Sequence, residues 1–415
     1  MGIDLFLPDW RRSSQLIAGE PFTICAGRLE RADQVNRERL FCSALPPHTA
    51  PLPMINDIYR DKKVLVTGHT GFKGAWLSLW LSKMGAEVIG LSDSVPTNPS
   101  HFVAGGIESI VETHFADIRD AQKVAEIIQS VKPDFVFHMA AQALVKPSYS
   151  NPLETVEINA MGTANVLAAL GKLDKVCNAV FITSDKCYEN VETYYGYRED
   201  DRLGGSDPYS TSKATAEIII SSFQRSFFAS PDPVRLAIAR AGNVIGGGDW
   251  SEDRLVPDIV KSWDAKEKVV IRRPQATRPW QLVLEPLSGY LQLGAQLSQS
   301  TDLHGESFNL GPPADAVFPV RDVVVELKKH LNGLDLTIDE SQANFHEAGL
   351  LKLCCDKALS VMGWKPVLDF NETLEMTASW YRNYYENSVP VQQFSEQQLD
   401  RYISLAEQRN LPWCR

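Results

Sequence analysis

The segment from Lys63 to Leu91 restricts the fold more than any other part of the sequence. A short β-branched run, Lys63–Gly68, leads into further glycines at Gly71 and Gly74, then a helical pattern and a strand-like run, Glu87–Leu91. A strand, a glycine turn, a helix and a strand within about 30 residues have the size of a βαβ crossover. The alternation continues well beyond this unit, and it predicts a Rossmann-type, doubly wound parallel sheet. Looser, mainly helical sequence after Gly242 predicts a smaller C-terminal substrate-binding lobe.

The spacing of the glycines in Thr67–Gly74 is typical of a dinucleotide-binding turn. The first glycine permits a tight exit from the strand, the second lets backbone amides approach a pyrophosphate, and the third permits close helix packing. The helix N-terminus would then face the anion. A bare glycine triplet also occurs in ordinary tight turns, so the strand before it and the helix after it carry the prediction.

Other cofactor contacts are expected where strands end. Asp93 follows the second strand and could accept the ribose hydroxyls, which would favour NAD over NADP, or it could be a solvated loop carboxylate. Small residues at Ala140 and Ala141 would let a flat ring lie against the backbone. The predicted cofactor-binding residues are Gly68, Thr70, Gly71, Phe72, Lys73, Gly74, Asp93, Asp117, Ile118, Ala140, Ala141, Gln142, Thr183, Tyr209 and Lys213.

Tyr209 directly precedes the predicted helix Ser210–Phe228, and Lys213 lies in its first turn, so the two are four residues apart. This spacing puts both side chains on one face. The ammonium can favour the tyrosinate, so that the phenol acts as a base below its usual pKa of about 10. The same spacing arises by chance on surface helices, and the cofactor site upstream gives it meaning.

The segment Thr183–Lys186 follows a predicted strand, Ala179–Thr183. Parallel sheets bind ligands at the carboxyl ends of their strands. A hydroxyl, an acid and an amine would therefore meet Tyr209 at the mouth of the site. The alternative is a solvated ion pair in a loop.

With these motifs the chain resembles the extended short-chain dehydrogenases/reductases, and within them the sugar-nucleotide 4,6-dehydratases. The resemblance extends from Met54 to about Tyr385. Related dehydratases usually have Asp-Glu where this chain has Asp185-Lys186. Lysine occurs there in the branch that acts on CDP-glucose and in one group that dehydrates N-acetylglucosamine, and the segment Cys187–Asn190 favours the CDP-glucose branch. The segments that carry the resemblance are Thr67–Leu77, Phe137–Val145, Thr163–Leu167, Thr183–Asn190, Pro208–Lys213, Arg240–Asp249, Arg254–Asp258, Arg278–Trp280 and Val283–Leu291.

The resemblance implies conversion of CDP-glucose to CDP-4-keto-6-deoxyglucose with bound NAD, an entry point to deoxysugars. Tyr209, helped by Lys213, would take the 4'-hydroxyl proton while hydride passes from C4' to NAD. Lys186, or a water it orders, would take the C5 proton, and a protonated Asp185 would donate to the departing 6-hydroxyl before hydride returns to C6. Ser184, or less favourably Thr183, would hydrogen-bond the 4'-oxygen. The expected catalytic residues are thus Ser184, Asp185, Lys186, Tyr209 and Lys213.

A nucleotide sugar carries a pyrophosphate, which planar guanidinium groups bind at two points. Arginines in the C-terminal part supply candidates, although each could be an ordinary surface charge. Two departures from the family pattern are Leu282, where a histidine is usual, and Leu353–Ala358, where Leu-Asp-Cys-Ser-Lys-Ala is usual. The predicted substrate-binding residues are Asn190, Asn243, Arg254, Arg272 and Arg278, with Arg273 as a further phosphate candidate.

Three parts of the chain are expected: a poorly ordered extension (1–58), an NAD-binding Rossmann domain (59–241), and a mainly nucleotide-sugar-binding lobe (242–415) with some segments returning to the first domain. The extension has no lysine before Lys62 and no periodic pattern. It lacks the layout of a secretory signal. It is either an over-long start upstream of Met54 or an interaction arm.

Composition limits the partners and the compartment. A formal net charge of −11 argues against a nucleic acid or an anionic membrane as partner. No apolar run reaches the roughly 18 to 20 residues that span a bilayer. Seven cysteines without metal-site spacing predict reduced thiols, no metal and a cytoplasmic protein. The resemblance implies a homodimer or homotetramer through helix Ser210–Phe228, whose apolar residues could otherwise be buried within one chain.

Other functions stay open at this point. The chain could be a dehydratase or epimerase that acts on another nucleotide sugar, such as UDP-N-acetylglucosamine or dTDP-glucose. It could be a plain NAD(P)H reductase, which would consume reduced cofactor. It could also be a non-catalytic NAD-binding regulator, although such proteins commonly lose the tyrosine or the lysine.

Overall fold

The computed structural model describes residues 55–229, 233–271, 273–338 and 350–414. All of them belong to one compact unit, His48–Arg415. The predicted extension therefore lies almost wholly outside the described residues. Its last residues form helix α2 (Ile55–Tyr59), in which the buried Tyr59 hydroxyl donates to the Leu291 carbonyl at 2.6 Å. The predicted boundaries at 58 and 241 stay predictions.

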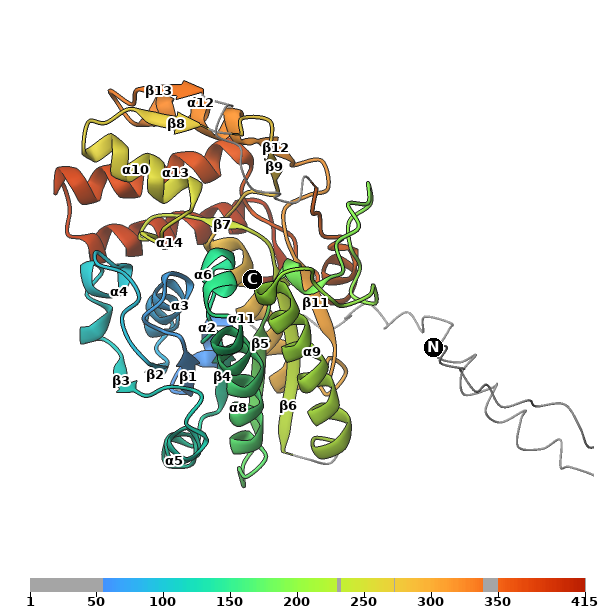
Figure 1. Ribbon diagram of the computed structural model, residues 1–415. Helices are drawn as coiled ribbons and strands as arrows, with labels where there is room; N and C mark the ends of the chain where they lie inside the picture. The colour runs from blue at the N-terminus through green and yellow to red at the C-terminus, as the bar shows by residue number, and fades with distance from the viewer. Residues whose placement is uncertain (1–54, 230–232, 272, 339–349, 415) are drawn as a thin grey trace, which may run out of the picture. The chain divides into compact units, whose positions relative to one another are not determined.

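A seven-stranded parallel sheet lies at the centre of this unit (Figure 1). Its strand order is β11-β6-β5-β4-β1-β2-β3, and every neighbouring pair is parallel. The order reverses between β1 and β4, where the chain leaves in opposite directions and a crevice forms beyond the strand ends. The strands are β1 (Lys63–Thr67), β2 (Glu87–Ser92), β3 (Glu112–Phe115), β4 (Phe135–His138), β5 (Cys177–Ile182), β6 (Val234–Ala241) and β11 (Ser307–Leu310).

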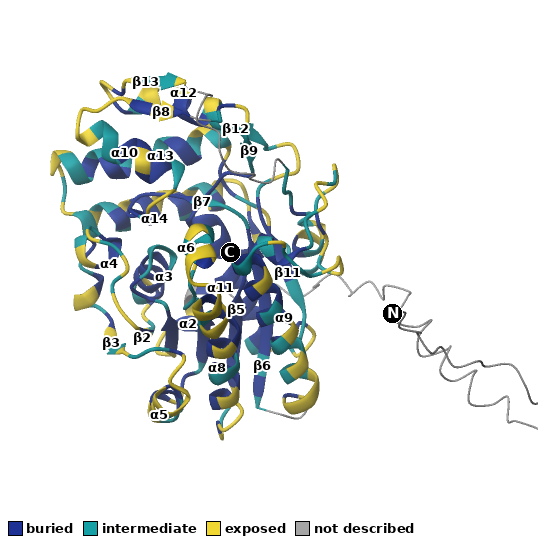
Figure 2. Cartoon of the chain, viewed as in Figure 1, coloured by how far each residue is buried: buried dark blue, intermediate teal, exposed yellow. Residues whose placement is uncertain are grey.

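Helices cover both faces of the sheet, as a doubly wound fold requires. On β1, Leu65 packs into one core cluster and Val64 and Val66 into the other, because successive strand side chains point to opposite faces. Figure 2 shows the strands buried between the helices. One face carries α5 (Ala121–Val131), α8 (Gly162–Leu170) and α9 (Pro208–Phe227), and the other carries α3 (Phe72–Lys83) and α11 (Leu284–Gln299).

The C-terminal elements are mainly helical, and they share the larger core cluster with α3 and α11. Three two-stranded sheets join them: β7 with β10, β9 with β12, and β8 with β13. None of the helices in the described ranges is long and apolar enough to cross a membrane. The elements are β7 (Val244–Ile245), α10 (Leu255–Asp264), β8 (Val269–Ile271), β9 (Thr277–Arg278), β10 (Gln281–Leu282), β12 (Phe318–Pro319), α12 (Val320–His330), β13 (Leu336–Ile338), α13 (Phe370–Glu386) and α14 (Val391–Gln408).

The predicted α/β fold class, with a mainly helical C-terminal part, is confirmed. The sequence of the stretch Pro152–Leu170 predicts one continuous helix, but the helix is interrupted: α7 (Pro152–Val156) and α8 flank a π-helical segment, Glu157–Met161. Strand β11 and helix α14 were not predicted. The remaining short elements are α4 (His101–Ala104), α6 (Val145–Ser150) and the 3₁₀ or π segments Ile107–Ser109, Asp185–Cys187, Ala358–Met362 and Pro412–Cys414.

The turn between β1 and α3 brings backbone against backbone. Gly68 has φ of +75°, and a Cβ atom there would lie 2.8 Å from the Ala140 nitrogen. A Cβ atom on Gly74 would lie 2.1 Å from the Gly68 carbonyl oxygen, well inside van der Waals contact. Neither neighbour is a flexible side-chain end, so the turn must shift if either glycine gains a side chain.

We expect Gly74→Ala to lower the free energy of unfolding by about 1–3 kcal/mol, because the added methyl group forces the turn apart. Denaturant unfolding followed by circular dichroism measures it. Gly171→Ala is a matched control: Gly171 ends α8 with ordinary φ of −62°, and its added Cβ would lie 3.5 Å from its nearest neighbour. That variant should be neutral or slightly more stable. Equal losses in the two variants would contradict the close packing inferred for Gly74.

Candidate active site

The first amides of α3 lie just beyond the end of β1. Gly71 occupies the N-cap of this helix, and no side chain caps it. The helix N-terminus therefore presents backbone N–H groups and the positive end of its dipole. The predicted residues Gly68 to Gly74 all lie in this turn or in the first turn of α3. They fit the pyrophosphate of a dinucleotide.

At the end of β2 the predicted ribose contact, Asp93, directly follows a buried serine. The buried last residue of the strand is Ser92, whose hydroxyl lies 2.9 Å from Nδ1 of His69 and 3.4 Å from the Thr70 amide nitrogen. Asp93 is the next residue and is exposed. At the following strand end, Asp117 pairs with Arg119 at 2.6 Å, and Ile118 is buried against Gly162. The group directed at the glycine turn is therefore a neutral hydroxyl.

The segment after β4 is fixed by hydrogen bonds on both sides. The Met139 and Ala140 amides each donate to the Thr67 hydroxyl at 3.1 Å, which closes the crevice between β1 and β4 at its base. The Gln142 amide donates to Oδ1 of Asn159 at 2.8 Å, and Nδ2 of Asn159 donates to the Gln142 carbonyl and the Ser212 hydroxyl. Asn159 lies in the π-helical segment. It links the predicted Ala140–Gln142 segment to α9.

Three predicted catalytic residues form a 3₁₀ turn at the end of β5. The Ser184 hydroxyl caps this turn by accepting from the Lys186 amide at 3.2 Å, and it donates to Oδ1 of Asp185 at 3.0 Å. Asp185 is buried, and its burial raises the pKa of the carboxyl, while Lys186, Ser184 and Lys73 act in the opposite direction. A Cβ atom on Gly242 would lie 3.1 Å from the carboxylate, so that glycine lets the end of β6 approach it. Asp185 is thus placed to hold a proton.

Tyr209 lies beside this turn, in the first turn of α9, behind its N-cap Asp207. Its side chain is buried close to Ser184. Burial raises the pKa of Tyr209 to about 12, Ser184 and Arg254 lower it, and Asp185 raises it. Lys213 is not among the groups that act most strongly on this pKa, so its expected effect on the tyrosinate stays a prediction.

Lys213 follows one turn later in α9 and is also buried. Burial lowers the pKa of its ammonium to about 8, while Glu217 and Cys187 raise it. Lys73 reaches the same centre from α3: burial lowers its pKa to about 8, and the charges of Arg254, Asp185 and Lys213 all act on it. Two amines, a phenol and a carboxyl from α3, α9 and the β5 turn therefore converge.

The predicted substrate residues are only partly brought together. Arg254 lies close enough to Tyr209 and Lys73 to shift their pKa values, and it pairs with Asp249 at 2.9 Å. Asn243 is half-buried just beyond β6, and Arg278 in β9 donates to the Thr277 carbonyl. Asn190 lies in the loop after the catalytic turn and donates to the Leu350 carbonyl at 3.2 Å. Arg272 is outside the described residues.

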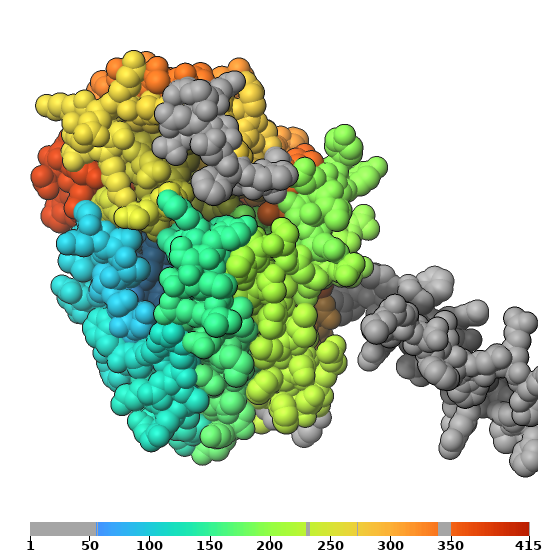
Figure 3. Space-filling view, in the orientation of Figure 1, coloured from blue at the N-terminus to red at the C-terminus, as the bar shows by residue number. Residues whose placement is uncertain are grey.

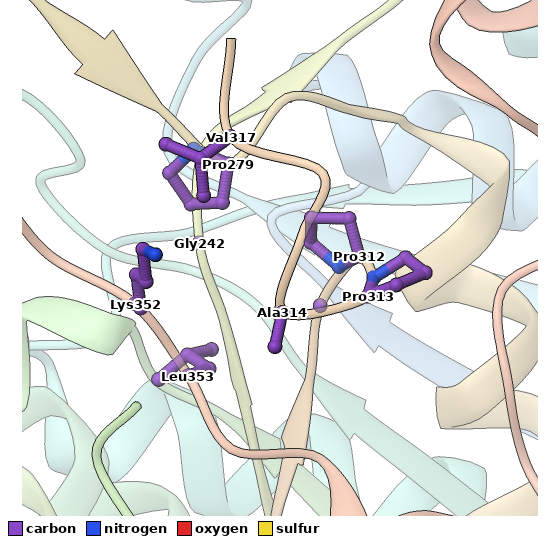
Figure 4. A pocket seen from close by; sticks show the side chains of 9 residues that line it. Gly242, Pro279, Pro312, Pro313, Ala314, Val317, Lys352 and Leu353 are labelled. Atoms are coloured by element: carbon purple, nitrogen blue, oxygen red, sulfur yellow. The ribbon is translucent and has the colours of Figure 1, made fainter. Parts of the chain in front are cut away.

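Gly242 also lines a small pocket, which Figure 4 shows from close by. Gly242 and Pro279 line one side, and Gly242 is the lining residue that lies next to Asp185. The Gly311–Ala314 loop and Leu353 close it, and among the described lining residues Lys352 alone is charged. The pocket joins the acid–base centre to the C-terminal segments.

Several residues of the site were missed by sequence reasoning. Ser92 and Asn159 carry no motif, because their roles depend on where β2 ends and on a π-helical break. Tyr290 of α11 is buried without a hydrogen-bond partner for its hydroxyl among the described residues. Burial raises the pKa of this hydroxyl, and Tyr209 and Asp185 raise it further. Glu217 lies four residues beyond Lys213, a spacing that could have singled it out.

Comparison with known sequences gives a consistent result. A sequence model of the family described as GDP-mannose 4,6 dehydratase matches residues 65–377. A CDP-glucose 4,6-dehydratase of Salmonella typhimurium is 45% identical over 331 residues, which are 79% of this chain and 92% of the relative. A UDP-glucose 4-epimerase of Mycoplasma pneumoniae is 24% identical over 345 residues, covering 78% of this chain and 97% of the relative.

Solved structures share the fold. A dTDP-glucose 4,6-dehydratase of Streptomyces venezuelae, determined with NAD bound, gives a TM-score of 0.66 at 21% identity and covers 79% of this chain and 99% of that one. A UDP-glucose 4-epimerase of Thermotoga maritima gives a TM-score of 0.67 at 22% identity and covers 77% and 99%. At these identities the likeness concerns the architecture.

The buried ammonium of Lys213 predicts a specific pH dependence of stability. Its pKa is about 8 in the folded chain against 10.5 when unperturbed, so between these values the unfolded chain binds a proton that the folded chain does not. Its contribution to the free energy of unfolding must then rise with pH. Compared with Lys213→Met, the wild-type protein should gain about 2 kcal/mol between pH 8 and 10.

Urea unfolding of both proteins across this range measures the difference. Lys73 and Tyr209 titrate in both proteins and largely cancel. If the free energy of unfolding of wild type does not rise relative to that of Lys213→Met between pH 8 and 10, burial does not lower the pKa of Lys213.

Proposed function

The chain belongs to the GDP-mannose 4,6 dehydratase family, and we propose that it is an NAD-dependent enzyme that converts CDP-glucose to CDP-4-keto-6-deoxyglucose. The observation that carries the proposal is the meeting of Tyr209 with Ser184 and Asp185 beside the buried Lys213. A base for an alcohol and an acid for a leaving hydroxyl lie side by side. A reaction that only oxidises a hydroxyl needs the base, but it does not need the acid.

The chain's residues fit NAD as the cofactor. The uncapped N-terminus of α3 and the glycine turn form a cradle for a pyrophosphate, with positions 68 and 74 closed to any side chain. Neutral Ser92 and exposed Asp93, at the end of β2, would face the ribose. Bound NAD supplies the hydride acceptor for oxidation at C4' and the hydride donor for reduction at C6.

The first half of the reaction needs a base at the 4'-hydroxyl. Tyr209 would take that proton as tyrosinate, and Ser184 would hold the 4'-oxygen by a hydrogen bond. The Thr183 hydroxyl donates to Glu217 at 2.5 Å, which favours Ser184 for this role. Lys213 would support the tyrosinate through its positive charge.

The second half is an elimination across C5 and C6. The 4-ketone acidifies the C5 hydrogen, and Lys186, or a water it orders, would remove it. The 6-hydroxyl leaves as water if it receives a proton, and Asp185 is the carboxyl whose pKa burial raises. An acid and an amine on adjacent residues of one turn can act on adjacent carbons of one sugar.

The substrate would be held by its diphosphate near the C-terminal part. Arg254 lies close enough to Tyr209 for its charge to lower the pKa of that phenol. We assign phosphate and sugar contacts to Arg254, Arg278, Asn243 and Asn190. The 45% identity to a CDP-glucose 4,6-dehydratase supports cytidine as the base.

The surface of α7 and α9 supports a homodimer, with a homotetramer as a larger possibility. Exposed apolar side chains gather on these contacting helices and on their neighbours α6 and the π-helical segment. Figures 2 and 3 show the outward side of α8 and α9 exposed on the viewer's face. The exposed residues are Tyr149, Leu153, Val156, Met161 and Ile218, whereas Ile220 and Phe228 are buried in the core.

We also infer a cytoplasmic location, which the free state of the five described cysteines supports.

Turnover of purified protein with CDP-glucose and no added NAD tests the function. We expect partial activity from co-purified cofactor, product detected by the alkaline absorbance of 4-keto sugars, and no net change in reduced cofactor. UDP-, GDP- and dTDP-hexoses serve as the comparison. Activity on UDP-N-acetylglucosamine alone would end the CDP-glucose assignment, and steady consumption of NADH would indicate a reductase.

We expect Tyr209→Phe to lower turnover by about 10²–10⁴-fold, the usual contribution of a general base, while NAD still binds. Lys186→Ala should oxidise C4' but fail to eliminate, so reduced cofactor should accumulate on the enzyme. Rapid-mixing absorbance measurements separate the two steps. Full product formation by Lys186→Ala would remove that residue from the mechanism.

We expect Leu153→Glu combined with Ile218→Glu to yield a monomer, because two charges would be buried in the proposed interface. Analytical ultracentrifugation reads the mass directly. Val325→Glu on α12 changes an equally exposed aliphatic residue elsewhere and should leave the assembly intact. A wild-type monomer would contradict the proposal, as would a double variant that remains dimeric.

A further inference from the structure

A buried ion pair lies next to the catalytic turn. Glu217 of α9 and Arg240 of β6 have side-chain exposures of 1% and 3%. Nε of Arg240 lies 2.8 and 2.9 Å from the two carboxylate oxygens, and Nη2 donates to the same carboxylate. Buried ion pairs add little stability over well-packed apolar residues, because desolvation offsets the attraction. Stability alone therefore does not account for this pair.

Both ends of the catalytic turn are bonded to the pair. Thr183, just before Ser184, donates its hydroxyl to Oε1 of Glu217 at 2.5 Å. Tyr188, just after Cys187, accepts from Nη1 of Arg240 at 2.7 Å, and the guanidinium carbon lies 4.9 Å from the centre of the Tyr188 ring. The turn between them holds Ser184, Asp185 and Lys186.

The same carboxylate acts on the helix that carries the base. Glu217 lies four residues after Lys213 and eight after Tyr209, so all three belong to one side of α9. Its charge raises the pKa of Lys213 against the effect of burial. Arg240, the other member of the pair, is connected through Tyr188 to the next strand: the Tyr188 hydroxyl donates to Asn309 of β11 at 2.7 Å.

We infer that the Glu217–Arg240 pair is a positioning device, which fixes the Ser184–Cys187 turn against the Tyr209 and Lys213 side of α9 so that both sets of groups reach one hexose. The inference rests on the proposed dehydratase reaction. The two halves of that reaction use groups from different elements, the oxidation from α9 and the elimination from the turn. A shared ion pair is the contact that sets their separation.

Thr183→Val and Tyr188→Phe test this without removing a buried charge. Each deletes one hydroxyl that bonds the turn to the pair. We expect kcat to fall by about tenfold or more, equivalent to about 1.4 kcal/mol of activation free energy, with little change in KM. The elimination should slow more than the oxidation. Incorporation of solvent deuterium at C5 measures the elimination, and nicotinamide absorbance measures the oxidation.

Tyr402→Phe is the matched control. Its hydroxyl is also buried and donates to an acidic residue, Glu285, at 2.8 Å, but it lies in α14. It should lower the melting temperature as much as Tyr188→Phe does and leave kcat unchanged. Glu217→Asp keeps the carboxylate and should retain more activity than Glu217→Gln.

Amide hydrogen exchange gives a readout that does not depend on activity. In both turn variants the amides of Ser184–Cys187 should exchange faster than in wild type, without substrate, and in Tyr402→Phe they should not. If wild-type protein does not turn over CDP-glucose, the proposed function fails, while the exchange result still decides whether the pair holds the turn. Normal kcat and normal exchange in both turn variants would reduce the pair to a structural contact and overturn the inference.

Discussion

Burial of the parallel sheet on both faces is the constraint from which the rest of the site follows. Helices cover each side, so strand interiors such as Val64–Val66 and Phe135–Phe137 must be apolar, and polar groups must lie where strands end. The carboxyl ends of β1, β4, β5 and β6 open into one crevice because the strand order reverses between β1 and β4. The hydrogen bonds from Met139 and Ala140 to Thr67 fix the floor of that crevice.

Burial also sets the electrostatics of the site. Lys73, Asp185, Tyr209 and Lys213 are each shifted by desolvation toward their neutral forms. Two amines with pKa values of about 8 are suited to respond to an anionic substrate and to exchange protons. A carboxyl with a raised pKa can keep the proton that a leaving hydroxyl requires. Glu217 of the buried pair places a negative charge near Lys213, and both members of the pair hydrogen-bond residues that flank the catalytic turn.

Much of this arrangement could be predicted from the sequence. The alternation of strands and helices, the glycine turn and the Ser184–Lys186 segment after a buried strand are local patterns, and each lies where it was expected. Ser92 shows where local pattern falls short: its hydroxyl reaches the glycine turn because β2 ends at this residue, and no motif marks that end point. The ribose contact of Asp93 stays a prediction. Helix Pro152–Leu170 reads as continuous, yet a π-helical break turns Asn159 toward Gln142 and Ser212.

The sequence by itself determined the fold class, the order of the elements and the residue types that reach each strand end, because hydrophobic periodicity and glycine geometry act over short stretches of chain. The tertiary structure alone decided which of those residues meet. Glu217 and Arg240 are distant in the chain from Thr183 and Tyr188, and the four residues form one network only because α9 packs across β5 and β6. Burial of the whole assembly then sets their charges, and burial is a property that no single segment has.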